Sequence, residues 1–85
     1  MDRTVEQIQA KVSAGLLPRQ APVKTWGGFG SDRPCDGCDE PILPNEVEYE
    51  VDFEDSPSIR LHAACYEAWQ QLVLPGPVAA HRAAG

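Results

Sequence analysis

The chain has 85 residues, with 7 basic and 13 acidic side chains, and a formal net charge of −6. A chain this short forms one domain and buries only about 60% of the surface that its unfolded form exposes, so apolar burial alone leaves little net stability. Six aromatic residues stand against fifteen Gly and Pro, which favours turns over long regular elements. We therefore expect a further stabilising device, and a bound metal ion would serve.

Cysteine number and hydropathy bear on the compartment. Three cysteines cannot all pair with one another, and the first seven residues lack the apolar stretch of a secretory signal. No apolar run approaches the roughly 20 residues needed to cross a bilayer, since the best candidate, residues 72–74, stops at Pro75. These features predict a soluble, cytoplasmic protein in a reducing compartment, with no membrane partner.

The charge is distributed unevenly along the chain. Residues 1–34 carry five basic and three acidic side chains (+2), whereas residues 35–85 carry two basic and ten acidic side chains (−8). The second part would repel phosphate backbones at long range, which disfavours nucleic acid as a partner. A plainer interpretation of the acidic run is a solvated face that aids solubility.

The first predicted element is a helix over residues 4–14. Thr4 can cap its first turn, with Gln7 three residues further on, and an apolar stripe recurs at helical spacing at Val5, Ile8 and Val12. Gly15 can take the positive φ of a Schellman ending, and Pro18 prevents the helix from resuming. Residues 1–17 are thus predicted to form an N-terminal helical unit.

Residues 18–34 hold three Pro and three Gly and show no periodicity, which predicts a connector. Neither the Walker motif nor the dinucleotide fingerprint is present. Trp26 and Phe29 are expected to close over the small core, with the glycines allowing a tight approach. A ligand-gripping loop over residues 26–31 is the alternative.

From residue 46 onwards, apolar and acidic residues alternate strictly, which predicts a half-buried strand. The apolar face comprises Val47, Tyr49, Val51 and Phe53, and the acidic face comprises Glu46, Glu48, Glu50 and Asp52. Residues 54–58 have turn chemistry and residues 59–61 resume the alternation, so the two segments should pair as an antiparallel hairpin.

A second helix is predicted over residues 63–72. Its buried face would carry Cys65, Ala68, Trp69 and Leu72, which recur at helical spacing. The tail over residues 75–85 contains two prolines and little to bury, and is expected to be disordered.

The most informative motif joins two cysteine-containing pairs. Cys35-x2-Cys38 and His62-x2-Cys65 are separated by 23 residues and have the residue types and local spacings of a structural Cys3His zinc site. Gly37 would permit the tight turn of a zinc knuckle, and the positive end of the second helix would help to hold a thiolate at Cys65. Four protein ligands leave no open position on the ion, so one structural Zn²⁺ is predicted.

Other interpretations of these residues fit less well. A redox Cys-x2-Cys would leave His62 and Cys65 unexplained, and an iron–sulfur cluster usually takes four thiolates. His81 lies in the predicted tail and is expected to be exposed and unliganded. No chemistry is assigned to three acidic residues beside the knuckle, Asp36, Asp39 and Glu40.

The order of knuckle, hairpin and helix resembles the treble-clef zinc fingers, in which the first turn of the helix gives the last two ligands. Cys35-x2-Cys38-x23-His62-x2-Cys65 also resembles the first zinc module of a LIM domain, although no second module follows Cys65. The whole stretch is similar to small, uncharacterised bacterial zinc-finger proteins. The resemblance implies a zinc-stabilised α+β treble-clef module over residues 35–74, with the N-terminal helix added to it.

Three hypotheses for function follow. The favoured one is an intracellular zinc-binding adaptor or regulatory protein, expected to be monomeric, that binds another protein through the acidic hairpin face or a groove near Trp26. The alternative is nucleic-acid binding through the basic residues of the first segment, namely Arg3, Lys11, Arg19, Lys24 and Arg33. An enzyme such as an HNH-type nuclease would need further catalytic His or Asn residues, so no enzymatic activity is predicted.

Overall fold

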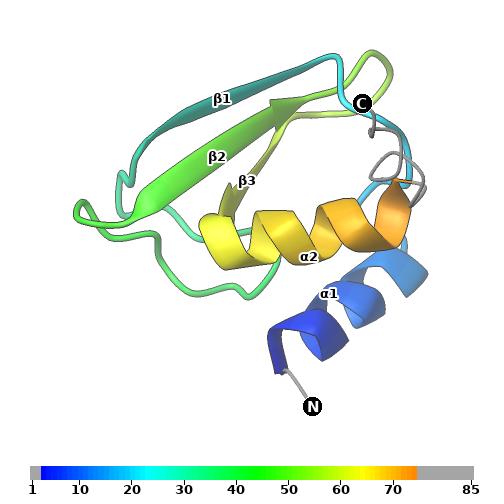
Figure 1. Ribbon diagram of the computed structural model, residues 1–85, viewed down its shortest axis with the longest axis horizontal. Coiled ribbons are helices and arrows are strands. Elements are labelled where there is room, and N and C mark those ends of the chain that lie inside the picture. The colour runs from blue at the N-terminus through cyan, green and yellow to red at the C-terminus, as the bar shows by residue number, and fades with distance from the viewer. Residues whose placement is uncertain (1–2, 75–85) are drawn as a thin grey trace, which may run out of the picture.

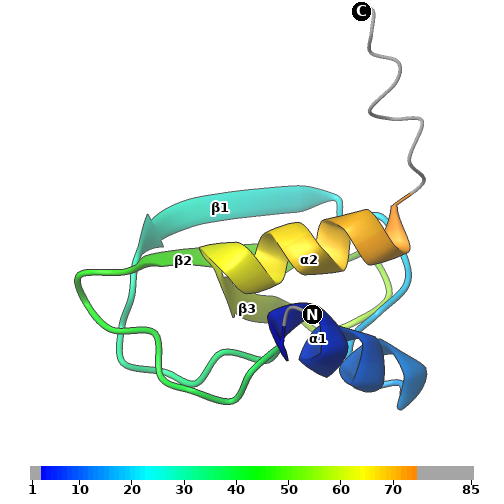
Figure 2. The same cartoon turned by 60° about the horizontal axis from the view of Figure 1, so that its bottom comes forward.

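The computed structural model describes residues 3–74. In chain order its elements are α1 (Arg3–Ser13), β1 (Lys24–Phe29), β2 (Val47–Asp52), β3 (Ile59–His62) and α2 (Ala63–Val73). The strands form one antiparallel sheet in the order β1-β2-β3. Both helices lie on one side of this sheet, with α2 against β2 and β3, and α1 against α2 (Figures 1 and 2). The predicted α+β class is confirmed.

Helix α1 agrees with its prediction to within one residue at each end. The apolar side chains that it buries are Ile8 and Val12. At its end Gly15 has φ 78° and donates to the Val12 carbonyl at 3.0 Å, while Leu16 N–H donates to the Lys11 carbonyl at 2.8 Å. This pair of bonds is the predicted Schellman ending. The buried residue that follows it is Leu17, whereas Leu16 is exposed.

The prediction of a connector over residues 18–34 is wrong for its middle part, because residues 24–29 form β1. The expectation that Trp26 and Phe29 close over the core is also wrong, since their exposed fractions are 52% and 80%. Gly27 and Gly28 interrupt any alternation, and β1 buries neither face fully. The strand is therefore stabilised by its ladder with β2 rather than by burial of an apolar face. Sequence periodicity detects only a buried apolar face, so it missed this strand.

The predicted hairpin is confirmed, with Val51 opposite Ile59 and Tyr49 opposite Leu61. Since β2 is the central strand, its acidic residues are half-buried among neighbours on the sheet face opposite α2, which we call the outer face. On it, Arg60 Nε lies 3.3 Å from Glu48 Oε2. Hydrogen bonds, first from Ser58 and then from the Trp26 indole, lower the pKa of the Asp52 carboxyl. On the acidic face of the hairpin, Arg60 thus compensates one charge, and Asp52 stays ionised and hydrogen-bonded within the chain.

The core lies between the sheet and α2 and centres on Trp69, which is fully buried. The ring of Phe53 meets Trp69 edge-on at a centroid distance of 5.7 Å, and the Trp69 indole N–H donates to the Pro18 carbonyl at 2.9 Å. The chain entering β1 is therefore anchored to α2. Within residues 3–74, no helix is long and apolar enough to cross a membrane. The predicted tail, with His81, lies outside the described residues.

Candidate metal centre

The first two cysteines lie at the tip of an arm that continues the β1–β2 pairing. Gly30 N–H donates to the Glu46 carbonyl at 2.9 Å, Asp32 N–H to the Ile42 carbonyl at 2.9 Å, and Cys35 N–H to the Glu40 carbonyl at 2.8 Å. Residues 30–46 therefore form an irregular paired arm, and its tip is the knuckle, residues 35–39. The arm is part of the same antiparallel hairpin as β1 and β2, which explains how the sequence delivers the knuckle to the end of the sheet.

The role predicted for Gly37 needs correction. The left-handed backbone in the knuckle belongs to Asp39, with φ 69°, and Gly37 does not have a positive φ. A Cβ atom on Gly37 would lie 2.6 Å from Ile8 Cδ1 and 3.1 Å from Cys65 Cβ. Glycine is therefore required here because α1 and α2 pack directly on the knuckle, rather than for turn conformation.

The knuckle is placed against β3 by two hydrogen bonds between Asp36 and the main chain of Arg60. Asp36 N–H donates to the Arg60 carbonyl at 2.8 Å, and its carboxylate accepts from Arg60 N–H at 2.8 Å. His62 ends β3 and occupies the N-cap position of α2, and Cys65 lies in the first turn of that helix. These connections bring the two halves of the motif to one point.

The four predicted ligand residues converge. One ligand atom from each of Cys35, Cys38, His62 and Cys65 lies within 4.8 Å of the other three. Cys38 Sγ is 3.4 Å from His62 Nδ1, close to the edge of about 3.6 Å that tetrahedral Zn–S and Zn–N bonds of about 2.3 and 2.05 Å would give. All three cysteines are free, so no disulfide competes for them. The cluster is a candidate metal site that is compatible with one zinc.

The imidazole of His62 is oriented by contacts at Nε2, the ring nitrogen that faces away from the cysteines. Its Nε2 lies 3.2 Å from the Pro41 carbonyl oxygen and 3.3 Å from Glu46 Oε1, while Nδ1 faces the sulfurs. An Nε2–H that donates to these oxygens leaves the Nδ1 lone pair available for a metal. Sequence reasoning assigned Glu46 to a solvent face and gave Pro41 no role. The Glu46 carboxylate also accepts from Leu43 N–H at 2.9 Å, which holds it beside the ring.

The thiols differ in their affinity for protons. The hydrogen bond from the Cys65 thiol lowers the pKa of Cys35 to about 4, with further help from the main-chain N–H groups of His62 and Gly37. The same bond raises the pKa of Cys65. Burial raises the pKa of Cys38. Burial opposes the charged form of His62, but the Cys35 thiolate and Glu46 outweigh it and raise the pKa of the ring.

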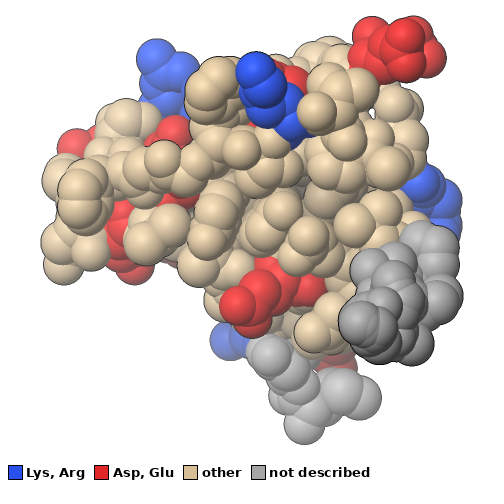
Figure 3. Space-filling model, turned by 45° about the horizontal axis from the view of Figure 1, so that its top comes forward, with Lys and Arg blue, Asp and Glu red and all other residues tan. Residues whose placement is uncertain are grey.

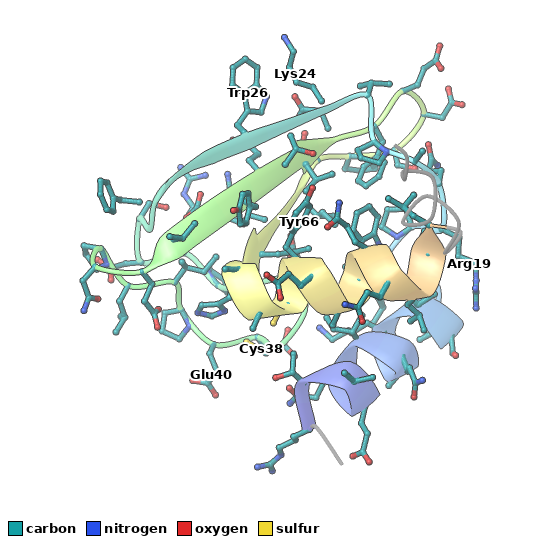
Figure 4. The ribbon with its side chains drawn as sticks, viewed as in Figure 1. Arg19, Lys24, Trp26, Cys38, Glu40 and Tyr66 are labelled. Atoms are coloured by element: carbon teal, nitrogen blue, oxygen red, sulfur yellow. The ribbon has the colours of Figure 1, made fainter. Side chains whose placement is uncertain are left out.

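Two carboxylates beside the site make hydrogen bonds of their own and are not among the four clustered residues. Asp36 bonds main-chain groups of β3, and Asp39 accepts from Lys11 Nζ at 2.8 Å, a cation that also donates to the Asp36 carbonyl at 3.0 Å. Glu40 is exposed and its side chain points away from the protein, whereas Cys38 lies close to the first turn of α2 (Figure 4). Lys11 therefore joins α1 to the knuckle, a contact that the sequence did not predict.

Comparisons with known proteins leave this site to be interpreted from its own geometry. No protein-family model, curated protein or solved structure matches the chain. The chemistry of the donor set, the orientation of His62 and the order of the elements around them therefore carry the functional argument.

Proposed function

We propose that this chain is a small zinc-binding protein in which a single structural Zn²⁺ is held by Cys35, Cys38, His62 and Cys65. The observation that carries the proposal is the convergence of three sulfurs and an oriented imidazole nitrogen from two segments far apart in the sequence. Thiolate and imidazole are the ligands of structural zinc sites, and four of them complete a tetrahedron. A closed set of this kind supplies folding free energy and leaves no position for an activated water.

The arrangement of elements supports a treble-clef interpretation. The knuckle contributes Cys35 and Cys38, the β2–β3 hairpin follows, and His62 and Cys65 come from its end and the first turn of α2. That is the order of the treble-clef zinc fingers and of the first zinc module of a LIM domain. Beyond that order, α1 and β1 are additions that pack on the helix and extend the sheet.

We further propose that the protein acts as an adaptor or regulatory module through contacts with another protein, and not as an enzyme. Among residues 3–74, the Cys3His set is the one cluster of His, Cys, Asp and Glu side chains placed to hold a metal ion. Two basic residues assigned to the nucleic-acid alternative have contacts within the chain, since Lys11 bonds the knuckle and Lys24 Nζ lies 4.6 Å from the Trp26 ring centroid. These contacts favour a protein partner over nucleic acid.

Native mass spectrometry of the purified chain tests the metal proposal. We expect one zinc per chain, which the variant Cys38→Ser should lose because it removes one of four ligands. Glu40→Gln is the matched control, since this exposed side chain near the knuckle should leave the stoichiometry at one. Two zinc ions, or none with all four ligands intact, would contradict the proposal.

The partner class is tested by affinity capture from the native cell with the zinc-loaded chain as bait, with Cys38→Ser as the unfolded control. A specific protein retained only by the zinc-loaded chain supports the adaptor role. A gel-retardation assay at low and moderate salt addresses the alternative, because nucleic-acid binding that survives moderate salt would contradict it.

A further inference from the structure

One edge of the sheet is covered by another segment of the chain, and the other edge is open. The outer edge of β3 is occupied by the knuckle, because the Asp36 N–H and carboxylate bond the carbonyl and N–H of Arg60. Strand β1 forms the other edge, and among the described helices and strands it contacts only β2. An exposed edge strand presents unpaired N–H and C=O groups that can pair with another strand.

The groups that β1 presents follow from its register. Gly30 donates to the Glu46 carbonyl, and hydrogen-bonded pairs alternate along an antiparallel ladder, so Gly28 and Trp26 exchange their main-chain bonds with β2. The N–H and C=O groups of the intervening residues point to the open edge. These residues are Thr25, Gly27 and Phe29.

Exposed apolar side chains gather at this edge. Of six large hydrophobic residues that are exposed in the described chain, three lie on β1 or next to it, namely Val23, Trp26 and Phe29. Trp26 projects from β1 on the side of the sheet away from the helices (Figure 4). Its indole N–H donates to Asp52 Oδ2 at 2.9 Å and Lys24 Nζ lies over its ring, so the exposed ring is held in place. Figure 3 turns the upper side of the molecule forward and shows a broad uncharged surface with charged groups around it.

We propose that β1 pairs antiparallel with β1 of a second copy of this chain, about a two-fold axis that passes beside Gly27. In this register Gly27 faces Gly27 of the second copy, and Thr25 faces Phe29 of the second copy. All three residues that point their main-chain groups to the edge are then paired, and a shift in either direction leaves some of them without a partner within the strand. The result is one continuous six-stranded sheet.

The side chains also fit this register. Trp26 lies opposite Gly28 of the second copy, which has no side chain, so this register places no side chain against the ring that Asp52 and Lys24 hold. Gly28 has no atom within 4 Å of the place where a Cβ would stand, so the space is open. Phe29 lies opposite Thr25 and diagonal to Gly27 of the second copy, within reach of a large ring. Lys24 is the one charged residue of β1, and the two copies of it lie at opposite ends of the pairing.

Sedimentation equilibrium of the full 85-residue chain, from micromolar to millimolar concentration, tests the proposal. We expect a monomer–dimer equilibrium, and we expect Thr25→Pro to weaken it by at least about tenfold, because proline removes an edge N–H and cannot extend the ladder. Thr25→Val keeps the N–H and should dimerise as the parent does. Amide dispersion in an NMR spectrum shows that each variant is folded. A chain that stays monomeric throughout, or a dimer that Thr25→Pro leaves unchanged, would overturn the proposal.

The register is tested by an NMR sample that mixes isotope-labelled and unlabelled chains. Antiparallel pairing at Gly27 brings Trp26 Hα close to Gly28 Hα of the second copy, whereas within one strand residues two apart are separated by roughly 6.6 Å. We expect an intermolecular cross-peak between these protons. A dimer with cross-peaks at another surface, or a monomer that binds an extended peptide of a different protein at β1, would contradict self-pairing.

Discussion

The two edges of the sheet show two ways of dealing with unpaired main chain. At β3, the knuckle approaches side-on and Asp36 satisfies both main-chain groups of Arg60. At β1, Thr25, Gly27 and Phe29 face outward, and within residues 3–74 no helix or strand lies against them on that side. The difference shows that the residues around the candidate metal site also complete the sheet. The knuckle orders the closed edge, whereas the open edge is ordered by the ladder to β2 and by the bond from Trp26 to Asp52.

Metal removal should have the largest effect, and it should act on the closed edge. A structural zinc site of this kind contributes about 10–16 kcal/mol of apparent binding free energy near neutral pH. Chelation should therefore release the knuckle from β3, α1 and α2 together, with loss of amide dispersion and of the near-ultraviolet signal of Trp69. If the metal-free, reduced chain keeps a dispersed spectrum, the knuckle stays packed on β3 without zinc, and the prediction is wrong.

Zinc binding at the closed edge should depend on pH. Zinc binds thiolates, whereas in the unfolded metal-free chain all three thiols have their ordinary pKa of about 8.5 and are protonated near neutral pH, so binding must displace about three protons. Binding should therefore weaken as the pH falls, by about 4.1 kcal/mol per pH unit for about three protons released. Isothermal titration calorimetry in buffers of different ionisation enthalpy measures the number of protons. A release near zero would show that the thiols are ionised beforehand.

Two glycine variants should show a smaller difference in stability between the two edges. Gly37→Ala should destabilise the zinc-loaded chain by about 1–3 kcal/mol, because the new methyl would overlap Ile8 Cδ1 in a packed interior. In the monomer, at low protein concentration, Gly28→Ala at the open edge meets no neighbouring atom and should be neutral or slightly stabilising. Chemical denaturation of both variants with zinc bound gives the two values. Similar losses would mean that the knuckle is not packed as described.

Periodicity and spacing predicted much of this structure. The helices and the β2–β3 hairpin could be predicted because each buries one stripe or face. The four clustered residues could be predicted because their spacing is typical of a zinc site. Strand β1 could not be predicted, since an edge strand with two adjacent glycines has no periodic buried face. The contacts of His62 with Pro41 and Glu46 depend on the path of the arm over residues 30–46, which local pattern does not encode. The need for glycine at position 37 comes from Ile8, 29 positions away in the sequence.

The two tryptophans give each region its own optical signal. Trp69 is sealed in the core with its indole N–H on the Pro18 carbonyl, whereas Trp26 is 52% exposed on β1. Acrylamide should therefore quench Trp26 and spare Trp69, and the two emissions should differ in wavelength because only one ring meets water. A single fluorescence experiment can thus follow core melting and edge coverage as separate signals, without an added label.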